Sequence, residues 1–443
     1  MSSPSPRTGW RESTRTSAAS ATRTRPTSWP PSPLSWTHLR LQPQPSLAAS
    51  GAGPAARAAA ATKESPAYNR RLALRDGASR KDTGHMKVGS GFGGGWLTDV
   101  EAGAVRAEEL GFDFANVAET AHDSILSSTL ALKATERIEI ATSVTIAFPR
   151  APMVLAMQAW DLQHLSKGRF SLGLGSQVKG HNQRRFSVPW VPPAPRMKDY
   201  IRTLKAIWKT FQTGEKPDHV SEHYQFTLIN PNFNPGPIEY PEPKVMLACV
   251  GAGMARAAGD VADGVYPHGF MTDKYMREVV LPNIAIGLRR SGRTWEDIEL
   301  SGGGFTVFGE NESEIEQGLE ALRQPISFYG STRSYHDVFE IHGWKDLGME
   351  LHSLSLAGKW DEMRRVIPED VLRGFAQTST YDDLPNFIRE NREYATRVGF
   401  GMPVKTPEQR ERFAHILGEI QKVEVPGVPR GLEDAVLPGA AVS

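Results

Sequence analysis

Apolar and polar residues follow two different periods along most of the chain, and the two periods alternate. In Asp99–Leu110 the apolar residues Val100, Ala104 and Ala107 recur every three to four residues, as they do on one face of a helix. In Ile138–Ile146 the apolar residues instead form a short, β-branched run that is typical of a buried strand. Strands that alternate with helices in this way predict an α/β fold with a parallel sheet.

The alternation continues through eight predicted strand–helix units. The predicted strands are Met86–Gly89, Phe112–Ala118, Ile138–Ile146, Phe170–Leu174, Val245–Val250, Gly264–Pro267, Leu300–Phe308 and Arg397–Val404. The predicted helices are Asp99–Leu110, Ser124–Lys133, Pro152–Leu165, Met197–Phe211, Met254–Val261, Tyr275–Ser291, Ser313–Arg323, Asp382–Glu393 and Pro407–Lys422. This pattern predicts a (β/α)8 TIM-type barrel with insertions. A doubly wound open sheet is the main alternative, but Arg256 stands where a dinucleotide fingerprint would place its third glycine.

Composition divides the chain into three regions. Residues 1–85 are rich in Ser, Thr, Pro, Ala and Arg without apolar periodicity, which predicts a disordered low-complexity extension. Residues 86–422 make up the predicted barrel, with insertions near 214–243 and 324–381, and residues 423–443 form a C-terminal tail.

The extension has three possible origins. Its Arg- and Ser-rich, acid-poor character resembles an organellar transit peptide. The explanation that we favour is a translation start at Met86, because "MKVGSGF" has the pattern of an opening strand. An N-terminal arm that binds nucleic acid is the third explanation.

Charge and cysteine content narrow the class of protein. The first 85 residues hold 13 Lys and Arg against four Asp and Glu, which leaves 38 basic and 46 acidic residues in the rest. A mildly acidic body is not expected to bind nucleic acid. The single cysteine, Cys249, excludes a disulfide within the chain, and no run of about 18 apolar residues is present. We therefore expect a cytoplasmic protein that does not enter a membrane.

The sequence contains no zinc-binding spacing, phosphate-binding Walker loop or G-x-S-x-G nucleophile motif, so no metal site is predicted. A barrel places its active site at the carboxyl ends of its strands. After the second strand, Glu119 and His122 are candidates for acid–base catalysis. The alternative is an ordinary helix start, with Asp123 as its N-cap.

Two strand exits consist of small residues that could bind an anion. Gly175-Ser176-Gln177 follows the fourth strand, and Gly251-Ala252-Gly253 follows the fifth at a helix start, where free N–H groups and the helix dipole favour negative charge. His181 and Arg185 would share one face of a helix after the first exit. A plain strand-to-loop exit and a solvated helix face remain the alternatives.

Several longer segments carry a family resemblance. "EELGFDFANVAET", "LSKGRFSLGLGSQ", "GAGMARAAGDVADGV" and "RRSGRTWEDIEL" resemble the luciferase-like monooxygenase superfamily, and most of all its branch of oxidoreductases that use the deazaflavin coenzyme F420. The resemblance runs from about residue 86 to residue 421. It implies a β/α barrel that holds a flavin or deazaflavin at its carboxyl-terminal mouth.

The resemblance also implies roles for particular residues. A non-proline cis peptide that supports the ring system would fall at Ser143-Val144, and acid–base catalysis would fall to a residue among Glu119, Thr120 and His122. Some flavin-using relatives carry an arginine at the position of Ser176, so the serine favours the deazaflavin. The cofactor-binding residues implied in this way or indicated by the strand exits are Ser143, Val144, Gly175, Ser176, Gln177, Val178, His181, Gly251, Ala252, Gly253 and Met254.

Three functions are compatible with this reading. The first is an F420-dependent oxidoreductase that transfers a hydride to or from a small organic substrate, with the insertion at 214–243 lying over the mouth. The second is a monooxygenase that uses FMN, and the third is a flavin-binding barrel without catalytic activity. The resemblance further suggests a homodimer.

Overall fold

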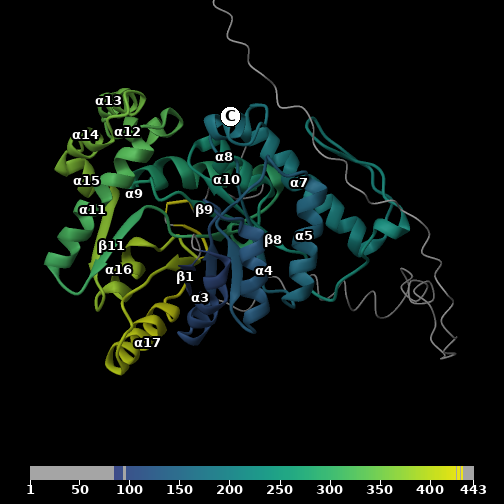
Figure 1. The fold of residues 1–443 in the computed structure, drawn as a ribbon, viewed down its shortest axis with the longest axis horizontal. Helices are drawn as coiled ribbons and strands as arrows, with labels where there is room; N and C mark the ends of the chain where they lie inside the picture. The colour runs from purple at the N-terminus through teal and green to yellow at the C-terminus, as the bar shows by residue number, and fades with distance from the viewer. Residues whose placement is uncertain (1–83, 93–95, 426, 430, 433–443) are drawn as a thin grey trace, which may run out of the picture. The chain divides into compact units, whose positions relative to one another are not determined.

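The computed structural model describes residues 84–92, 96–425, 427–429 and 431–432. Of the predicted extension at 1–85, only residues 84 and 85 are among the described residues; of the predicted tail at 423–443, only 423–425, 427–429 and 431–432 are. Within the described residues, a parallel sheet closes on itself and helices cover its outside (Figure 1).

Eight strands form the barrel. They are β1 (Lys87–Phe92), β2 (Phe114–Val117), β3 (Glu139–Thr142), β5 (Phe170–Gly175), β8 (Lys244–Cys249), β9 (Gly264–Pro267), β10 (Glu299–Leu300) and β13 (Arg397–Gly399). Their order is β10-β9-β8-β5-β3-β2-β1-β13, and a parallel bridge between Ser301 and Arg397 joins the two ends. The predicted (β/α)8 barrel is confirmed.

Each barrel strand leads to a helix on the outside of the barrel. These helices are α3 (Leu97–Glu109), α4 (Ser124–Ala134), α5 (Pro152–Leu165), α7 (Pro193–Thr213), α8 (Ala252–Val261), α10 (Leu281–Ser291), α16 (Leu384–Asn391) and α17 (Pro407–Gln421). Local capping agrees with the sequence pattern. Asp123, for example, accepts hydrogen bonds from the N–H groups of Ile125 and Leu126 and so begins α4 as an N-cap.

The third predicted strand is divided in two. The run Ile138–Ile146 contains β3 and the short strand β4 (Thr145–Ile146), and both pair with β5. The peptide bond between Ser143 and Val144, which separates them, is cis.

The seventh predicted strand, Leu300–Phe308, was wrong. Leu300 ends β10, whereas β11 (Phe305–Gly309) belongs to a separate two-stranded sheet with β12 (Ala376–Thr380). Gly304, between the two strands, has a φ of 84°, a left-handed conformation that turns the chain away from the barrel. The eighth strand was also predicted too long, because β13 ends at Gly399.

The first predicted insertion contains short elements, and the second is largely helical. The first holds the hairpin β6 (His219–Val220) and β7 (Gln225–Phe226), followed by η1 (Pro231–Phe233). The second begins within α11 and is helical up to β12. Its elements are α11 (Glu312–Gly330), η4 (Arg333–Tyr335), α12 (His336–Glu340), α13 (Lys345–Leu356), α14 (Trp360–Arg365) and α15 (Glu369–Phe375).

The remaining short elements lie in the loops between strands and their helices. They are α6 (Lys179–Arg184) before α7, α9 (Asp273–Tyr275) with the π-helical turn η2 (Met276–Val280) before α10, and η3 (Trp295–Asp297) before β10. The predicted helix Tyr275–Ser291 is thus a π-helical turn joined to an α-helix.

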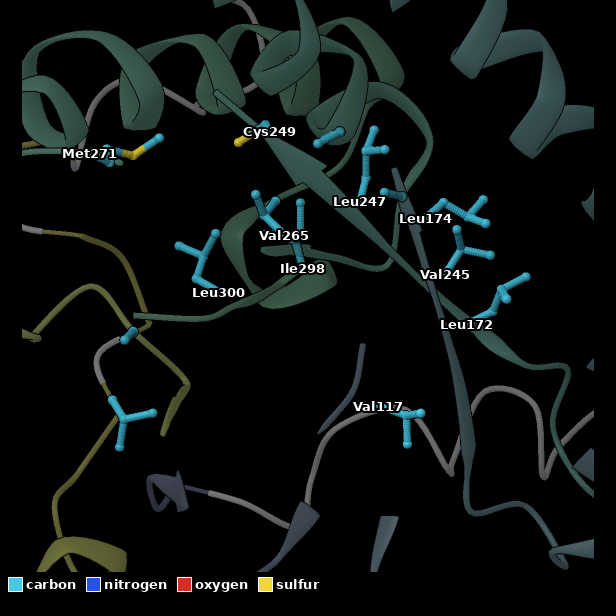
Figure 2. Packing of buried hydrophobic residues seen from close by; sticks show 14 of the residues in the cluster. Val117, Leu172, Leu174, Val245, Leu247, Cys249, Val265, Met271, Ile298 and Leu300 are labelled. Atoms are coloured by element: carbon cyan, nitrogen blue, oxygen red, sulfur yellow. The ribbon is translucent and has the colours of Figure 1, made fainter. Parts of the chain in front are cut away.

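The main apolar core lies between the strands and the surrounding helices. Figure 2 shows Leu172 and Leu174 of β5 beside Val245 and Leu247 of β8, and all four are fully buried. Cys249 lies in the same layer, where burial raises the pKa of its thiol to about 12, so it acts as a small apolar core residue.

Charged residues fill the barrel at the ends where its strands begin. The Arg397 side chain is 0% exposed and its Nη1 lies 3.0 Å from carboxylate oxygens of both Glu139 and Glu299. Lys87 pairs with the same two carboxylates, and Lys244 pairs with Glu299 at 2.6 Å. Mutual pairing is what permits charges at such depth.

Helices α8 and α10 approach each other through two glycines. A Cβ atom at Gly259 would collide with the backbone of Ile284, and one at Gly287 would collide with the backbone of Arg256. The two helix backbones are therefore in direct contact.

Candidate active site

The two predicted anion-binding turns lie at the same end of neighbouring strands. The parallel register between β5 and β8 pairs Leu174 with Leu247. Gly175 and Ser176 therefore leave the barrel beside the exit that leads to Gly251, at the carboxyl-terminal mouth where barrels of this type place their active sites. The structure brings these two predicted groups together.

The Ser143–Val144 segment contacts the first of these turns. A Cβ atom at Gly175 would lie 2.5 Å from Cγ2 of Val144, so a side chain has no room there. The N–H group of Ala147 donates a hydrogen bond of 3.0 Å to the carbonyl oxygen of Gly175. The cis bond implied by the resemblance is present and adjoins the turn.

The turn after Gly175 is held by a buried asparagine. Nδ2 of Asn182 donates hydrogen bonds to the carbonyl oxygens of Ser176 and Val178, at 2.9 and 3.2 Å. Gln177, between these residues, has a φ of 56°, and His181 is exposed on α6. The Asn182 side chain was missed at the sequence level, and its Oδ1 is buried without a hydrogen-bond partner among the described residues.

The second turn begins helix α8 without a side-chain cap. The carbonyl oxygen of Gly251 accepts the N–H groups of Met254 and Ala255, whereas those of Ala252 and Gly253 have no acceptor within the described residues. A Cβ atom at Gly251 would meet no other atom within 4 Å, so the space beside this residue is open. Free N–H groups at a helix N-terminus favour an anion.

Glu119, a predicted catalytic residue, is held in a buried ion pair. Its two carboxylate oxygens accept hydrogen bonds of 2.8 and 3.0 Å from Arg150, and Ser124 Oγ donates another at 2.7 Å. Arg150 also pairs with Asp123 at 2.7 Å. Burial disfavours the charge of Arg150, but the hydrogen bonds and charge of Glu119 outweigh it and raise the pKa of Arg150. The arrangement favours a positioning role for Glu119.

His122, the second predicted catalytic residue, lies nearby but is not joined to Glu119. Its side chain is half-buried, forms no hydrogen bond within the described residues, and contacts the ring of Trp96 at a centroid distance of 5.0 Å. Arg185 donates a hydrogen bond of 2.7 Å to the carbonyl oxygen of Thr120, which ties this loop to the segment after β5. His122 thus keeps its ring nitrogen atoms without a hydrogen bond among the described residues.

The floor of the mouth is formed by side chains inside the barrel. The hydroxyl of Tyr266 on β9 lies 3.3 Å from Oδ1 of Asn116 on β2, which spans the interior. Burial raises the pKa of Tyr266 to about 12, so its hydroxyl keeps its proton at neutral pH. Gly173 leaves room for this ring, because a Cβ atom there would come within 2.9 Å of it.

The part of the chain that the structure describes contains neither a membrane-spanning helix nor a metal-binding cluster. No helix there has the length and apolar character needed to span a membrane. In the same residues, no cluster of three or more His, Cys, Asp or Glu side chains is placed to hold a metal ion.

Comparison with known proteins assigns the family. The model of the luciferase-like monooxygenase family matches residues 83–397, and the chain belongs to this family. Members of the family are oxidoreductases, which places this chain among the enzymes of that class.

Individual relatives agree with the family assignment. The uncharacterised protein Rv1360 of Mycobacterium tuberculosis is 41% identical over 290 residues, which cover 66% of this chain and 85% of that protein. The 5,10-methylenetetrahydromethanopterin reductase of Archaeoglobus fulgidus is 22% identical over 323 residues, or 71% of this chain and 92% of that enzyme. The solved coenzyme F420-dependent tetrahydromethanopterin reductase of Methanopyrus kandleri superposes with a TM-score of 0.58 at 18% identity, covering 76% and 98% of the two chains.

The described residues fit a phosphate-bearing flavin or deazaflavin. The uncapped start of α8 supplies N–H donors for a phosphate, and the open space beside Gly251 leaves room for one. The unpaired Oδ1 of Asn182 offers an acceptor next to the neighbouring turn. Such a cofactor supplies hydride chemistry, and the protein supplies its binding and orientation.

Proposed function

We propose that the chain is an F420-dependent oxidoreductase that transfers a hydride to or from a small organic substrate. The observation that carries this proposal is the adjacency of the two turns predicted to bind an anion, after β5 and at the start of α8, at one barrel mouth. The F420-dependent reductase among the solved structures with this fold supports the choice of cofactor. Ser176, in place of the arginine of some flavin-using relatives, supports it further.

We assign the predicted cofactor contacts to separate parts of the cofactor. The turn Gly251–Met254 and the neighbouring Gly175–Val178 would hold the phosphate, and Ser143 and Val144 would support the ring system. His181 is exposed on α6 and would reach only the outer part of the cofactor. Of the two predicted catalytic residues, His122 is the better placed for proton transfer, because both oxygens of Glu119 already bind Arg150.

Cofactor binding and turnover together test the proposal. Purified protein is titrated with coenzyme F420 and, separately, with FMN, while intrinsic tryptophan fluorescence is recorded. We expect saturable binding of F420, weaker binding of FMN, and reduction or oxidation of F420 with at least one member of a panel of alcohols and carbonyl compounds.

Other outcomes would support the alternatives. Tight binding of FMN with oxygen-dependent oxidation of its reduced form would replace the proposal with a monooxygenase. Saturable binding without turnover across the whole panel would favour a flavin-binding barrel without catalytic activity.

We also propose that the protein forms a homodimer through α4 and α5. These two helices expose Leu126, Val154, Met157 and Leu165, and a hollow of about 490 Å³ lies between them. Apolar side chains grouped on one face favour association. Light scattering should report twice the chain mass, and Met157→Glu should give monomers. A monomeric wild-type protein at micromolar concentration would contradict this.

A further inference from the structure

His268 follows β9 on the side of the strand that faces the barrel interior. Tyr266 points inward, because its hydroxyl reaches Asn116 on the opposite side of the barrel. Gly264, two residues earlier, lies beside its neighbour on β8, and a Cβ atom there would collide with the Met246 side chain. The N–H group of His268 donates to the carbonyl oxygen of Cys249 at 3.1 Å, so the pairing with β8 extends to this residue. The two-residue period of a strand then places His268 one layer above Tyr266, at the mouth.

The hydrogen bonding of His268 fixes which nitrogen carries a proton. Its Nδ1 accepts a hydrogen bond of 2.9 Å from the N–H group of Phe270, so Nδ1 is unprotonated. Burial lowers the pKa of His268 to about 4, and the ring is therefore neutral near pH 7 with its proton on Nε2. Within the described residues, Nε2 forms no hydrogen bond, and it is not among the fully buried atoms that lack a partner. This N–H group is available to a ligand.

Two tyrosines from the second insertion form aromatic walls around this group. The Tyr329 ring, on α11, meets the His268 ring edge to face at a centroid distance of 4.6 Å, and the Tyr335 ring, on η4, lies 5.3 Å away. Burial raises the pKa of Tyr335 to about 12, so its hydroxyl is neutral. Neither tyrosine hydroxyl is hydrogen-bonded within the described residues. Uncharged donors between aromatic rings suit an apolar molecule with one oxygen acceptor.

We propose that His268, Tyr329 and Tyr335 form the substrate pocket, in which Nε2–H of His268 donates a hydrogen bond to the oxygen of an aromatic ketone or of the corresponding alcohol. The proposal rests on the proposed function and identifies its substrate class. A buried neutral donor binds a carbonyl oxygen but offers nothing to a cation, and the surrounding rings favour an apolar body.

The same hydrogen bond would act during the reaction. If a reduced cofactor bound at the mouth supplied a hydride to the carbonyl carbon, the π electron pair would move to oxygen, and Nε2–H of His268 would stabilise the developing negative charge. Proton transfer to the oxygen, the role proposed above for His122, would then give the alcohol. His268 keeps its own proton throughout, in agreement with the neutral state that its burial imposes.

The test uses acetophenone as the probe and does not depend on the cofactor. Full-length protein labelled with ¹⁵N-histidine is titrated with acetophenone without cofactor, and the Nε2 resonance of His268 is followed by NMR. Three variants are compared: His268→Phe removes the donor but keeps a ring, His268→Gln restores a donor near the position of Nε2, and His415→Phe changes an exposed histidine on α17 as the matched control. Melting temperatures verify that each variant folds.

We expect saturable binding of acetophenone with a shift of the His268 resonance. His268→Phe should weaken binding roughly tenfold, which is the loss of one hydrogen bond, whereas His268→Gln should recover most of it and His415→Phe should change nothing. No binding up to the solubility limit of acetophenone, or equal binding by His268→Phe and the wild-type protein, would overturn the proposal. Failure of F420 to bind would refute the proposed function instead, and that is measured separately.

Discussion

Two substitutions at Gly251, at the start of α8, differ in charge but hardly in shape, and they test whether a cofactor phosphate binds there. Gly251 has φ and ψ of −85° and 160°, an ordinary extended conformation, and a Cβ atom there would meet nothing within 4 Å. Asp and Asn are both good N-cap residues and gain a few tenths of a kcal/mol over glycine at such a position. Gly251→Asp and Gly251→Asn should therefore fold at least as stably as the parent protein.

The two variants should differ strongly in cofactor affinity. Like charges about 4 Å apart repel by about 1 kcal/mol in a water-like environment and by about 4 kcal/mol at the effective dielectric constant of a protein surface. If a cofactor phosphate binds at this N-terminus, Gly251→Asp should bind coenzyme F420 roughly 5- to 1000-fold more weakly than Gly251→Asn. Added salt should narrow the difference, because it screens the repulsion.

Isothermal titration calorimetry at low and high salt measures the affinity of each variant for coenzyme F420, and melting curves measure the stability of each variant. Equal affinities for the two variants would show that no phosphate lies near Gly251, and the proposed cofactor position would be lost. A lower melting temperature in the Asp variant alone would show that the residue has a structural role that the open space does not reveal.

The remaining predictions concern two buried ion networks. Arg150→Met should lower the free energy of unfolding by about 3 kcal/mol, because it leaves the buried Glu119 carboxylate without its partner. The double variant with Glu119→Gln should regain part of that loss. Urea unfolding measures both values, and a loss below about 1 kcal/mol for Arg150→Met would contradict the reasoning. Burial tends to raise the pKa of Glu299, but the charges of Arg397, Lys244 and Lys87 together outweigh it and hold that pKa well below its usual range. The ion pairs of Glu299 stabilise the folded protein fully above the unfolded pKa of about 4.3, and this stabilisation is lost as the pH falls from there towards the lower pKa of the folded state. Urea midpoints should therefore be constant above about pH 5 and drop between about pH 5 and pH 3; a constant midpoint over that lower range would argue against it.

Most helices and strands could be predicted from the sequence, because the local spacing of apolar residues determines them. The helix Pro152–Leu165 and the strand Gly264–Pro267 were predicted with the bounds that the structure has. The division of Leu300–Phe308 was not predicted, because the run is continuously apolar or small. Only the pairing of β11 with β12, some 70 residues further along the chain, shows that the strand leaves the barrel.

The sequence predicted the backbone turns of the candidate site but not the side chains that pair with its residues. Gly175 and Gly251 stand out in sequence because small residues end a strand there. Arg150 carries no such signal, since a lone arginine before a helix is usually solvated, and its pairing with Glu119 depends on a contact across 31 residues. His268 follows a strand that was predicted from the sequence. Its proposed role in substrate binding could not be predicted, because it depends on aromatic rings from an insertion that begins more than 50 residues later.

The direct backbone contact between α8 and α10 has a consequence for ligand capture. With Gly259 and Gly287 seated against each other, α8 has little freedom to slide or tilt, and the free N–H groups at its first turn are aimed before any anion arrives. A binding site that is preorganised in this way loses little conformational entropy when an anion binds. A single methyl group introduced at Gly259, far from the ligand, would therefore misalign the donors at the opposite end of the helix.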